Sequence, residues 1–176
     1  MGAVLERPEL QALLDYWLQK RGGRAMPARG DIDPAEIPRL LPDLGLVDVL
    51  HGGADFRFRL LGTRITELFH ADFTGMTVGD IEVDHYRSFL ESRYRRVVAE
   101  RCPIYSETVF GAGGREHLRA WRLCVPLSNS GDGVDMILFM LRVSSAPKRL
   151  SRGQTLATLR PITEEIRALD TAGPGR

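Results

Sequence analysis

The sequence predicts an α+β fold in which a five-stranded antiparallel sheet carries helices. Several stretches alternate apolar and polar residues with a period of two, which is typical of strands. Within 55–81 the period changes to that of a helix. The last strand stretch, 134–143, is apolar on both faces, so both faces of the sheet should be covered. We expect an N-terminal segment at 1–45, a central domain at 46–143 and a C-terminal extension at 144–176.

The first predicted element is an amphipathic helix over 8–20. Pro8 suits a first helical turn, and Gly22-Gly23 is a typical stop. Two interpretations of its apolar stripe stay open: the helix packs on its own domain, or it joins two subunits in a homodimer or contacts a partner protein. The residues of this possible interface have the spacing of one helix face: Leu10, Leu13, Leu14, Trp17 and Leu18.

The next strands begin the central domain. We expect a strand over 46–50, a glycine turn at 51–54 and an antiparallel strand over 55–61. In the second strand Phe56, Phe58 and Leu60 should share one face. Helical spacing then runs over 65–69 and, after Asp84 as an N-cap, over 85–101.

Three further strand signals follow at 104–110, 117–127 and 134–143. In the middle one Trp121, Leu123 and Val125 share a face. The short helices of 63–101 can cover one face of the sheet, and the helix of 8–20 is the expected cover for the other. In the tail, the spacing of Ile162, Ile166 and Leu169 predicts a C-terminal helix ending near Asp170.

Composition excludes several classes of protein. A net charge of +1, from 24 basic and 23 acidic residues, argues against a nucleic-acid binder. No apolar run is long enough to span a membrane, and the N-terminus lacks the pattern of a signal peptide. Cys102 and Cys124 lie too far apart for a CxxC site, so we interpret them as ordinary reduced cysteines of a cytosolic protein, with a disulfide as the open alternative. We therefore expect a cytoplasmic protein.

The order of these elements resembles that of a PAS domain over about 46–143. The run 58–69 is similar to a PAS strand leading into a helix, and 72–77 is similar to the segment that follows it. The stretch 21–29, with Asp33-Pro34, resembles a family of standalone bacterial PAS-like proteins of largely unknown function. The resemblance implies a cavity between sheet and helices that can hold a ligand, and flanking helices that mediate dimerisation.

Residue patterns for catalysis or cofactors are weak. No run is similar to the flavin-binding LOV cysteine motif, and His70 and His85 are isolated candidates for a haem ligand. No nucleophile elbow, phosphate loop or metal cluster occurs. We expect no enzyme activity, no catalytic residue, no metal and no cofactor.

The preferred hypothesis is a non-enzymatic sensory or regulatory domain of bacterial signalling that binds a small organic ligand, a signalling partner protein, or both. The alternatives are a haem- or flavin-binding redox protein or small ligand-transforming enzyme, and a structural adaptor with a filled core. Tyr105, Arg119 and Trp121 could hold a small organic anion or the head of a lipid-like ligand. The full expected cavity lining is Phe58, Leu60, Leu68, Phe69, Phe73, Phe89, Tyr105, Arg119, Trp121 and Leu123.

Overall fold

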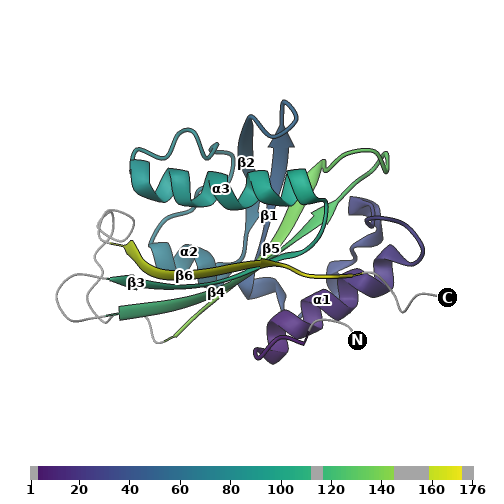
Figure 1. Cartoon of the computed structure of the whole chain (residues 1–176), viewed down its shortest axis with the longest axis horizontal. Helices are drawn as coiled ribbons and strands as arrows, with labels where there is room; N and C mark the ends of the chain where they lie inside the picture. The colour runs from purple at the N-terminus through teal and green to yellow at the C-terminus, as the bar shows by residue number, and fades with distance from the viewer. Residues whose placement is uncertain (1–3, 112–116, 145–158, 172–176) are drawn as a thin grey trace.

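A six-stranded antiparallel sheet forms the centre of the computed structural model, which describes residues 4–111, 117–144 and 159–171 (Figure 1). Its strand order is β2-β1-β5-β4-β3-β6, so β1 and β5, the first and last strands of the predicted central domain, are neighbours inside the sheet. The strands are β1 (Leu44–Leu50), β2 (Asp55–Leu61), β3 (Ile104–Gly111), β4 (His117–Leu127), β5 (Met136–Val143) and β6 (Arg160–Ala168).

Helices cover both faces of this sheet. In Figure 1, α3 (Asp84–Glu100) lies on one side and α1 (Pro8–Arg21) on the other. The short α2 (Thr63–Phe69) lies on the α3 side, where its residues share a cavity lining with α3. Three 3-10 turns connect α1 to β1, at Arg29–Asp31, Pro34–Glu36 and Leu41–Asp43. The predicted α+β class and its antiparallel sheet are therefore confirmed.

The N-terminal helix packs on the sheet of its own chain. The Trp17 indole Nε1–H donates a 2.7 Å hydrogen bond to the carbonyl oxygen of Pro126 in β4. Trp17, Leu10, Leu13 and Leu14 are almost completely buried, and Leu18 packs against the same core at partial exposure. Of the two open interpretations of this helix, its packing favours cover of its own domain.

The prediction of a C-terminal helix was wrong. Residues 160–168 form the edge strand β6, paired with β3, where a helix was expected. Ile162 and Ile166 are four residues apart, a spacing that places two side chains on one face of a strand as well as of a helix. Pro161 also suits an edge strand, which needs fewer backbone donors. The sheet consequently has six strands instead of five, and one strand comes from the expected C-terminal extension.

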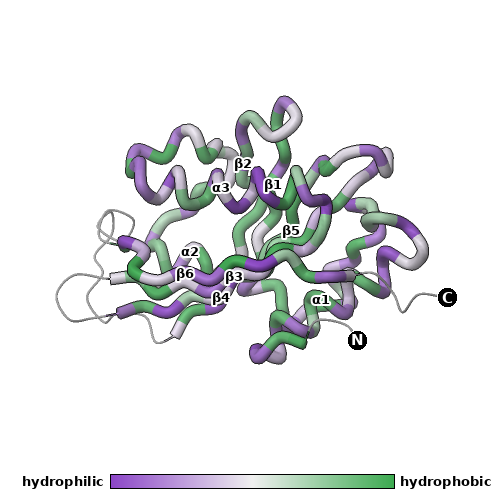
Figure 2. Tube along the Cα trace, in the orientation of Figure 1, coloured by the Kyte–Doolittle hydropathy of each residue, from purple (hydrophilic) through white to green (hydrophobic). Residues whose placement is uncertain are grey.

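The strands differ in how they are held. Figure 2 shows β5 hydrophobic over most of its length, whereas hydrophilic residues interrupt β6. Most of β6 is exposed, so backbone pairing with β3 holds much of it. Buried side chains flank it: Leu159 before the strand and Leu169 after it. In the described part of the chain, no helix is both long enough and apolar enough to cross a membrane.

Candidate functional site

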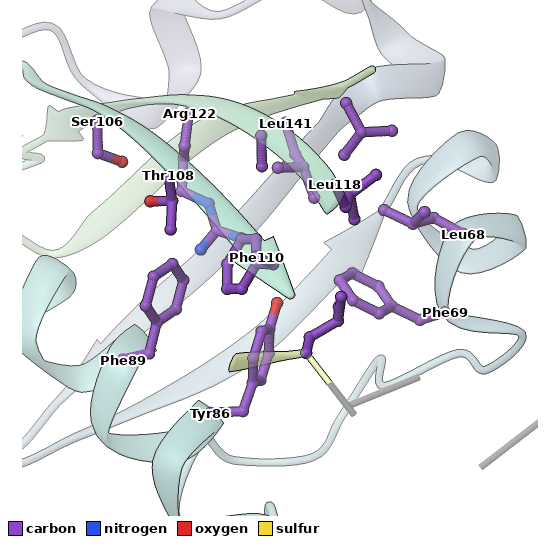
Figure 3. Close-up of a pocket in the computed structure, with 13 residues that line it drawn as sticks. Leu68, Phe69, Tyr86, Phe89, Ser106, Thr108, Phe110, Leu118, Arg122 and Leu141 are labelled. Atoms are coloured by element: carbon purple, nitrogen blue, oxygen red, sulfur yellow. The ribbon is translucent and has the colours of Figure 1, made fainter. Parts of the chain in front are cut away.

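Two adjoining cavities lie between the sheet and the helices α2 and α3. They share four lining residues, Phe69, Tyr86, Arg122 and Leu141. Each has a cavity volume of only about 20 Å³, which is room for roughly one water molecule. Figure 3 shows the first cavity, with side chains from the sheet above and from the helices below. This face of the sheet is therefore packed closely but incompletely.

A continuous row of aromatic rings lines the two cavities. Successive ring centroids lie 5.1–6.2 Å apart in edge-on, tilted or stacked pairs, which is the range of favourable aromatic contacts. The Phe139 ring of β5 closes the wall from the sheet, directly over Gly45, where an added Cβ atom would lie 2.2 Å from the ring. In order along the row, the rings are those of Phe58, Phe73, Phe69, Tyr86, Phe89 and Phe110, the first from β2 and the last from β3.

The central polar group of the site is Arg122, which lies in β4 and lines both cavities. Its side chain points from the strand toward the Tyr86 hydroxyl (Figure 3). The residue is only 5% exposed, and its Nη1 has no hydrogen-bond partner among the described protein atoms. The guanidinium lies 5.4 Å from the Phe139 ring centre and 5.8 Å from that of Phe89. A charged donor is thus held in an apolar chamber.

A second buried arginine, Arg93 of α3, has an acidic partner. Its Nη2 contacts the carboxylate of Glu164 in β6, and its Nη1 donates a 2.6 Å hydrogen bond to the carbonyl oxygen of Phe89. Burial, together with the neighbouring charge of Arg122, lowers the pKa of Arg93 to about 10. Both arginines therefore stay charged at neutral pH.

Neutral hydroxyls and one thiol complete the polar groups of this face. Ser106 and Thr108 of β3 line the first cavity, and Tyr94 of α3 lines the second. The Tyr94 hydroxyl is buried without a partner among the described protein atoms, and burial raises its pKa well above the usual range. Burial also raises the pKa of the Cys124 thiol to about 11. These groups are neutral hydrogen-bonding groups at physiological pH.

Half of the expected cavity lining lies at the cavities. Phe58, Leu68, Phe69, Phe73 and Phe89 line one or both of them. Their role in ligand binding stays a prediction.

Leu60 was placed wrongly, because it is 52% exposed. The β1–β2 register pairs Val47 with Phe58 but Leu46 with Leu60, so one extra residue is inserted at Arg59. Such a bulge reverses the alternation of the strand beyond it. Leu61, and not Leu60, consequently lines the cavity next to Phe58.

Four more expected residues, Tyr105, Arg119, Trp121 and Leu123, lie on the opposite face of the sheet. They alternate with the cavity-lining Ser106, Ala120 and Arg122 along the strands. The guanidinium of Arg7, next to α1, lies 3.5 Å from the centre of the Trp121 ring. Both faces of these strands carry apolar residues, so alternation alone did not identify which face lines the cavities under α2 and α3. The predicted anion site at Tyr105, Arg119 and Trp121 is therefore wrong in position.

Sequence reasoning missed the residues that give the site its charge, Arg122, Arg93 and Glu164. One signal was present: Arg122 interrupts an otherwise apolar run of β4, in phase with Ala120 and Cys124. A charged residue inside a doubly covered strand is rare and marks a position with a specific partner or role. The pairing of Arg93 with Glu164 could not be found without knowing that 160–168 is a strand.

A cleft of about 280 Å³ adjoins the cavities at the sheet end. It shares Leu68, Leu141 and Val143 with the first cavity, so these apolar side chains separate the cavity from the cleft. Its rim carries the buried Asp43, which pairs with Arg64 at 2.6 Å and with Arg142 at 2.9 Å. The cleft therefore borders the inner cavities across a layer of apolar side chains.

The two histidine candidates do not converge on these cavities. His85 Nε2 lies 2.9 Å from the carbonyl oxygen of Leu159, and His70 is an exposed residue that ends α2 with a φ of 50°. The described residues contain no cluster of three or more histidine, cysteine or acidic side chains able to hold a metal ion.

Comparison with known proteins adds family information. A family model described as PAS domain matches residues 5–141. Among solved structures, the chain is similar to "Structure of the PAS domain from Bordetella pertussis BvgS", at 20% identity and a TM-score of 0.45. That match covers 65% of this chain and 88% of the other. No curated protein matches the chain.

Proposed function

Because the chain belongs to the PAS domain family, whose members are generally sensory modules, we propose that it is a non-enzymatic sensor that binds a small molecule beside Arg122. The observation that carries this proposal is the pair of cavities flanking a buried guanidinium with an unpaired nitrogen. Such a site combines an apolar enclosure with a few polar groups, as ligand sites do. The free cysteines Cys102 and Cys124 support a cytoplasmic, reducing location.

We propose that ligand binding in the cavity affects the protein surface through the C-terminal edge strand, β6. Leu159, just before β6, lines the first cavity, and Glu164 within β6 contacts the buried Arg93. The outer side of β6 is exposed. A ligand that changes the position of Arg93 or Leu159 would change how firmly β6 is docked. We propose that a signalling protein partner, or a second copy of the chain, binds with an affinity that depends on whether β6 is docked on the sheet.

The structure gives less support to a homodimer through α1 than to the binding of a small molecule. Leu10, Leu13, Leu14 and Trp17 are almost completely buried against their own chain, so they are not available at the surface. A dimer through this helix would need α1 to leave its sheet.

Native mass spectrometry of the chain purified from its own host tests the proposal. We expect a non-covalent small-molecule adduct on the wild type and its loss in Ala120→Leu, because Ala120 lines the first cavity and a larger side chain fills it. Ala12→Leu, at an exposed position of α1 that lines neither cavity, is the matched control and should keep the adduct. Bare-chain mass alone, with no stabilisation by any small molecule added, would contradict the proposal.

One observation favours a second candidate, the structural adaptor with a filled core. Two cavities of about 20 Å³ each leave no room for a sizeable ligand unless side chains move. A haem or flavin would need a far larger displacement, which argues against the redox alternative. The same mass measurement separates sensor from adaptor, since an adaptor carries no adduct.

A further inference from the structure

The cavity face of the sheet holds more buried positive charge than negative charge. Arg122 and Arg93 are 5% and 2% exposed, and their charges are close enough to affect each other. Glu164 is the acidic partner of Arg93. Among the described residues, neither cavity lining includes an aspartate or glutamate. Two guanidiniums and one carboxylate leave one positive charge at the site.

A buried guanidinium with an unpaired nitrogen is costly. Arginine keeps its charge in proteins, so it cannot relieve burial by losing a proton. The Tyr86 hydroxyl is a hydrogen-bond partner of the Arg122 guanidinium, but Nη1 has no partner among the described atoms. The ring centres of Phe139 and Phe89 lie close to the outer limit of cation–π contact. The hydroxyl of Tyr94 is unpaired in the same region. A bound ligand that supplies the missing hydrogen bonds would explain why such destabilising side chains are present in an apolar core.

We infer that this site binds a small organic monocarboxylate, with its carboxylate against Arg122 and its apolar body among the aromatic rings of the cavity. The inference rests on the proposed function, because it gives the chemical class of the ligand at the same site.

Three properties of the site select this class. One surplus positive charge matches one carboxylate, whereas a dicarboxylate or phosphate would bring excess negative charge into an apolar chamber. The planar guanidinium pairs well with a planar carboxylate, and the Tyr86 hydroxyl lies beside it as a further donor (Figure 3). Apart from the neutral hydroxyls of Ser106, Thr108 and Tyr94, the remaining lining is apolar. The small volume limits the ligand to a few atoms or requires Leu68 and Leu141 to move toward the neighbouring cleft.

The test compares an acid with its neutral isostere. Propionate and propionamide have nearly the same shape, and differ in the charge that Arg122 would recognise. We expect propionate to raise the melting temperature of the full chain and to give a saturable isotherm in titration calorimetry, with sodium chloride at equal ionic strength as the blank. Propionamide should bind at least about tenfold more weakly, since a charge-assisted hydrogen bond is lost. Benzoate and benzamide repeat the comparison for a larger apolar body.

Variants locate the effect. Arg122→Met should weaken propionate binding by about ten- to a hundredfold and remove the preference for acid over amide. Arg119→Met is the matched control, because Arg119 lies on the opposite face, where it pairs with Glu107. It should leave both affinities unchanged. Should Arg122→Met fail to fold, Tyr86→Phe keeps the aromatic ring, and the acid–amide comparison in the wild type decides the question.

The failures of this test are distinguishable. Equal binding of acid and amide, or carboxylate binding that survives in Arg122→Met, would overturn the inference and leave a sensor of neutral ligands. An effect reproduced by sodium chloride would also overturn it, as would a site that holds a water molecule only. Absence of binding by every probe, together with bare-chain mass in native spectra, would overturn the proposed function as well.

Discussion

The two faces of the sheet are both covered by helices, yet they are built differently. On the α1 face, Trp17 is fully buried and its one polar atom is hydrogen-bonded to Pro126. On the α2–α3 face, two arginines are buried, and Arg122 Nη1 and the Tyr94 hydroxyl are unpaired among the described atoms. The first face satisfies the usual rules of a core, whereas the second face departs from them where a ligand could act.

The contrast between the faces is not absolute, because the α1 face also has an unpaired buried atom, Arg21 Nε. The rest of that guanidinium is satisfied, however: its two terminal nitrogens donate to Thr171 at 3.0 and 2.9 Å. The α1 face therefore ties the C-terminal end of the described chain to the N-terminal helix. On the cavity face the terminal nitrogens of Arg93 also have partners, but Arg93 Nε, Arg122 Nη1 and the Tyr94 hydroxyl are unpaired among the described atoms. We therefore expect the two faces to respond differently to substitution.

The largest effect is expected on the α1 face. Trp17→Ala removes a fully buried ring and its hydrogen bond, and should lower the free energy of unfolding by about 3–5 kcal/mol. Chemical denaturation measures the loss, and Leu18→Ala, which is only partly buried, should cost clearly less. A folded Trp17→Ala chain of unchanged stability, but with an altered oligomeric mass, would return α1 to the role of an interface.

The ion pair that links β6 to the cavity face gives the next largest effect. Glu164→Gln leaves the buried Arg93 without an anion and should cost about 2–3 kcal/mol, below the range for fully buried pairs because Glu164 is 30% exposed. Arg93→Met leaves a carboxylate that can reach water, so it should cost less. In Glu164→Gln the amide hydrogen-exchange rates of β6 should increase more than those of β5, relative to the wild type. Equal costs for the two variants would show that the pair is not what holds β6.

The pH dependence of stability should report the burial of Cys124. Its pKa in the folded chain, about 11, lies above the ordinary value of 9.0, so the unfolded chain releases this proton first. Stability should therefore fall as pH rises above about 9, by roughly 1–2 kcal/mol near pH 10.5. Cys124→Ala should flatten that part of the curve relative to Cys102→Ala. A curve unchanged by Cys124→Ala would place this thiol in contact with water.

Tyrosine-to-phenylalanine variants give a matched pair with a smaller effect. The Tyr16 hydroxyl donates to Glu36 at 2.7 Å and accepts from the Asp33 backbone N–H at 2.9 Å. Tyr16→Phe should cost about 1 kcal/mol. Tyr94→Phe removes an unpaired buried hydroxyl, so it should be neutral or slightly stabilising. A larger loss in Tyr94→Phe than in Tyr16→Phe, measured by denaturant unfolding, would reverse the contrast between the two faces.

Much of the fold could be predicted from periodicity alone. The helix predicted over 8–20 and the strand predicted over 117–127 are present at Pro8–Arg21 and His117–Leu127. Prediction failed where a pattern suits two structures. Ile162 and Ile166 fit a strand as well as a helix, and the bulge at Arg59 moved Leu60 to solvent without changing the pattern.

The site was harder to predict than the fold. Since the strands are apolar on both faces, alternation could not show whether Trp121 or Arg122 faces the cavity. The pairing of Arg93 with Glu164 joins residues 71 positions apart through β6, whose place in the sheet was unknown. Aromatic residues at helical spacing, such as Phe69 and Phe89, could be placed because the helices that carry them were predicted correctly.

A two-dimensional proton–nitrogen NMR titration of the wild type with propionate tests the contrast between the faces most directly. The chain has two tryptophans, Trp17 and Trp121, and both lie on the α1 side of the sheet. We predict saturable shifts for backbone amides of Arg122, Thr108 and Phe89, with both indole signals unmoved. Shifts centred on the indoles, or no saturable shift at Arg122, would contradict the account.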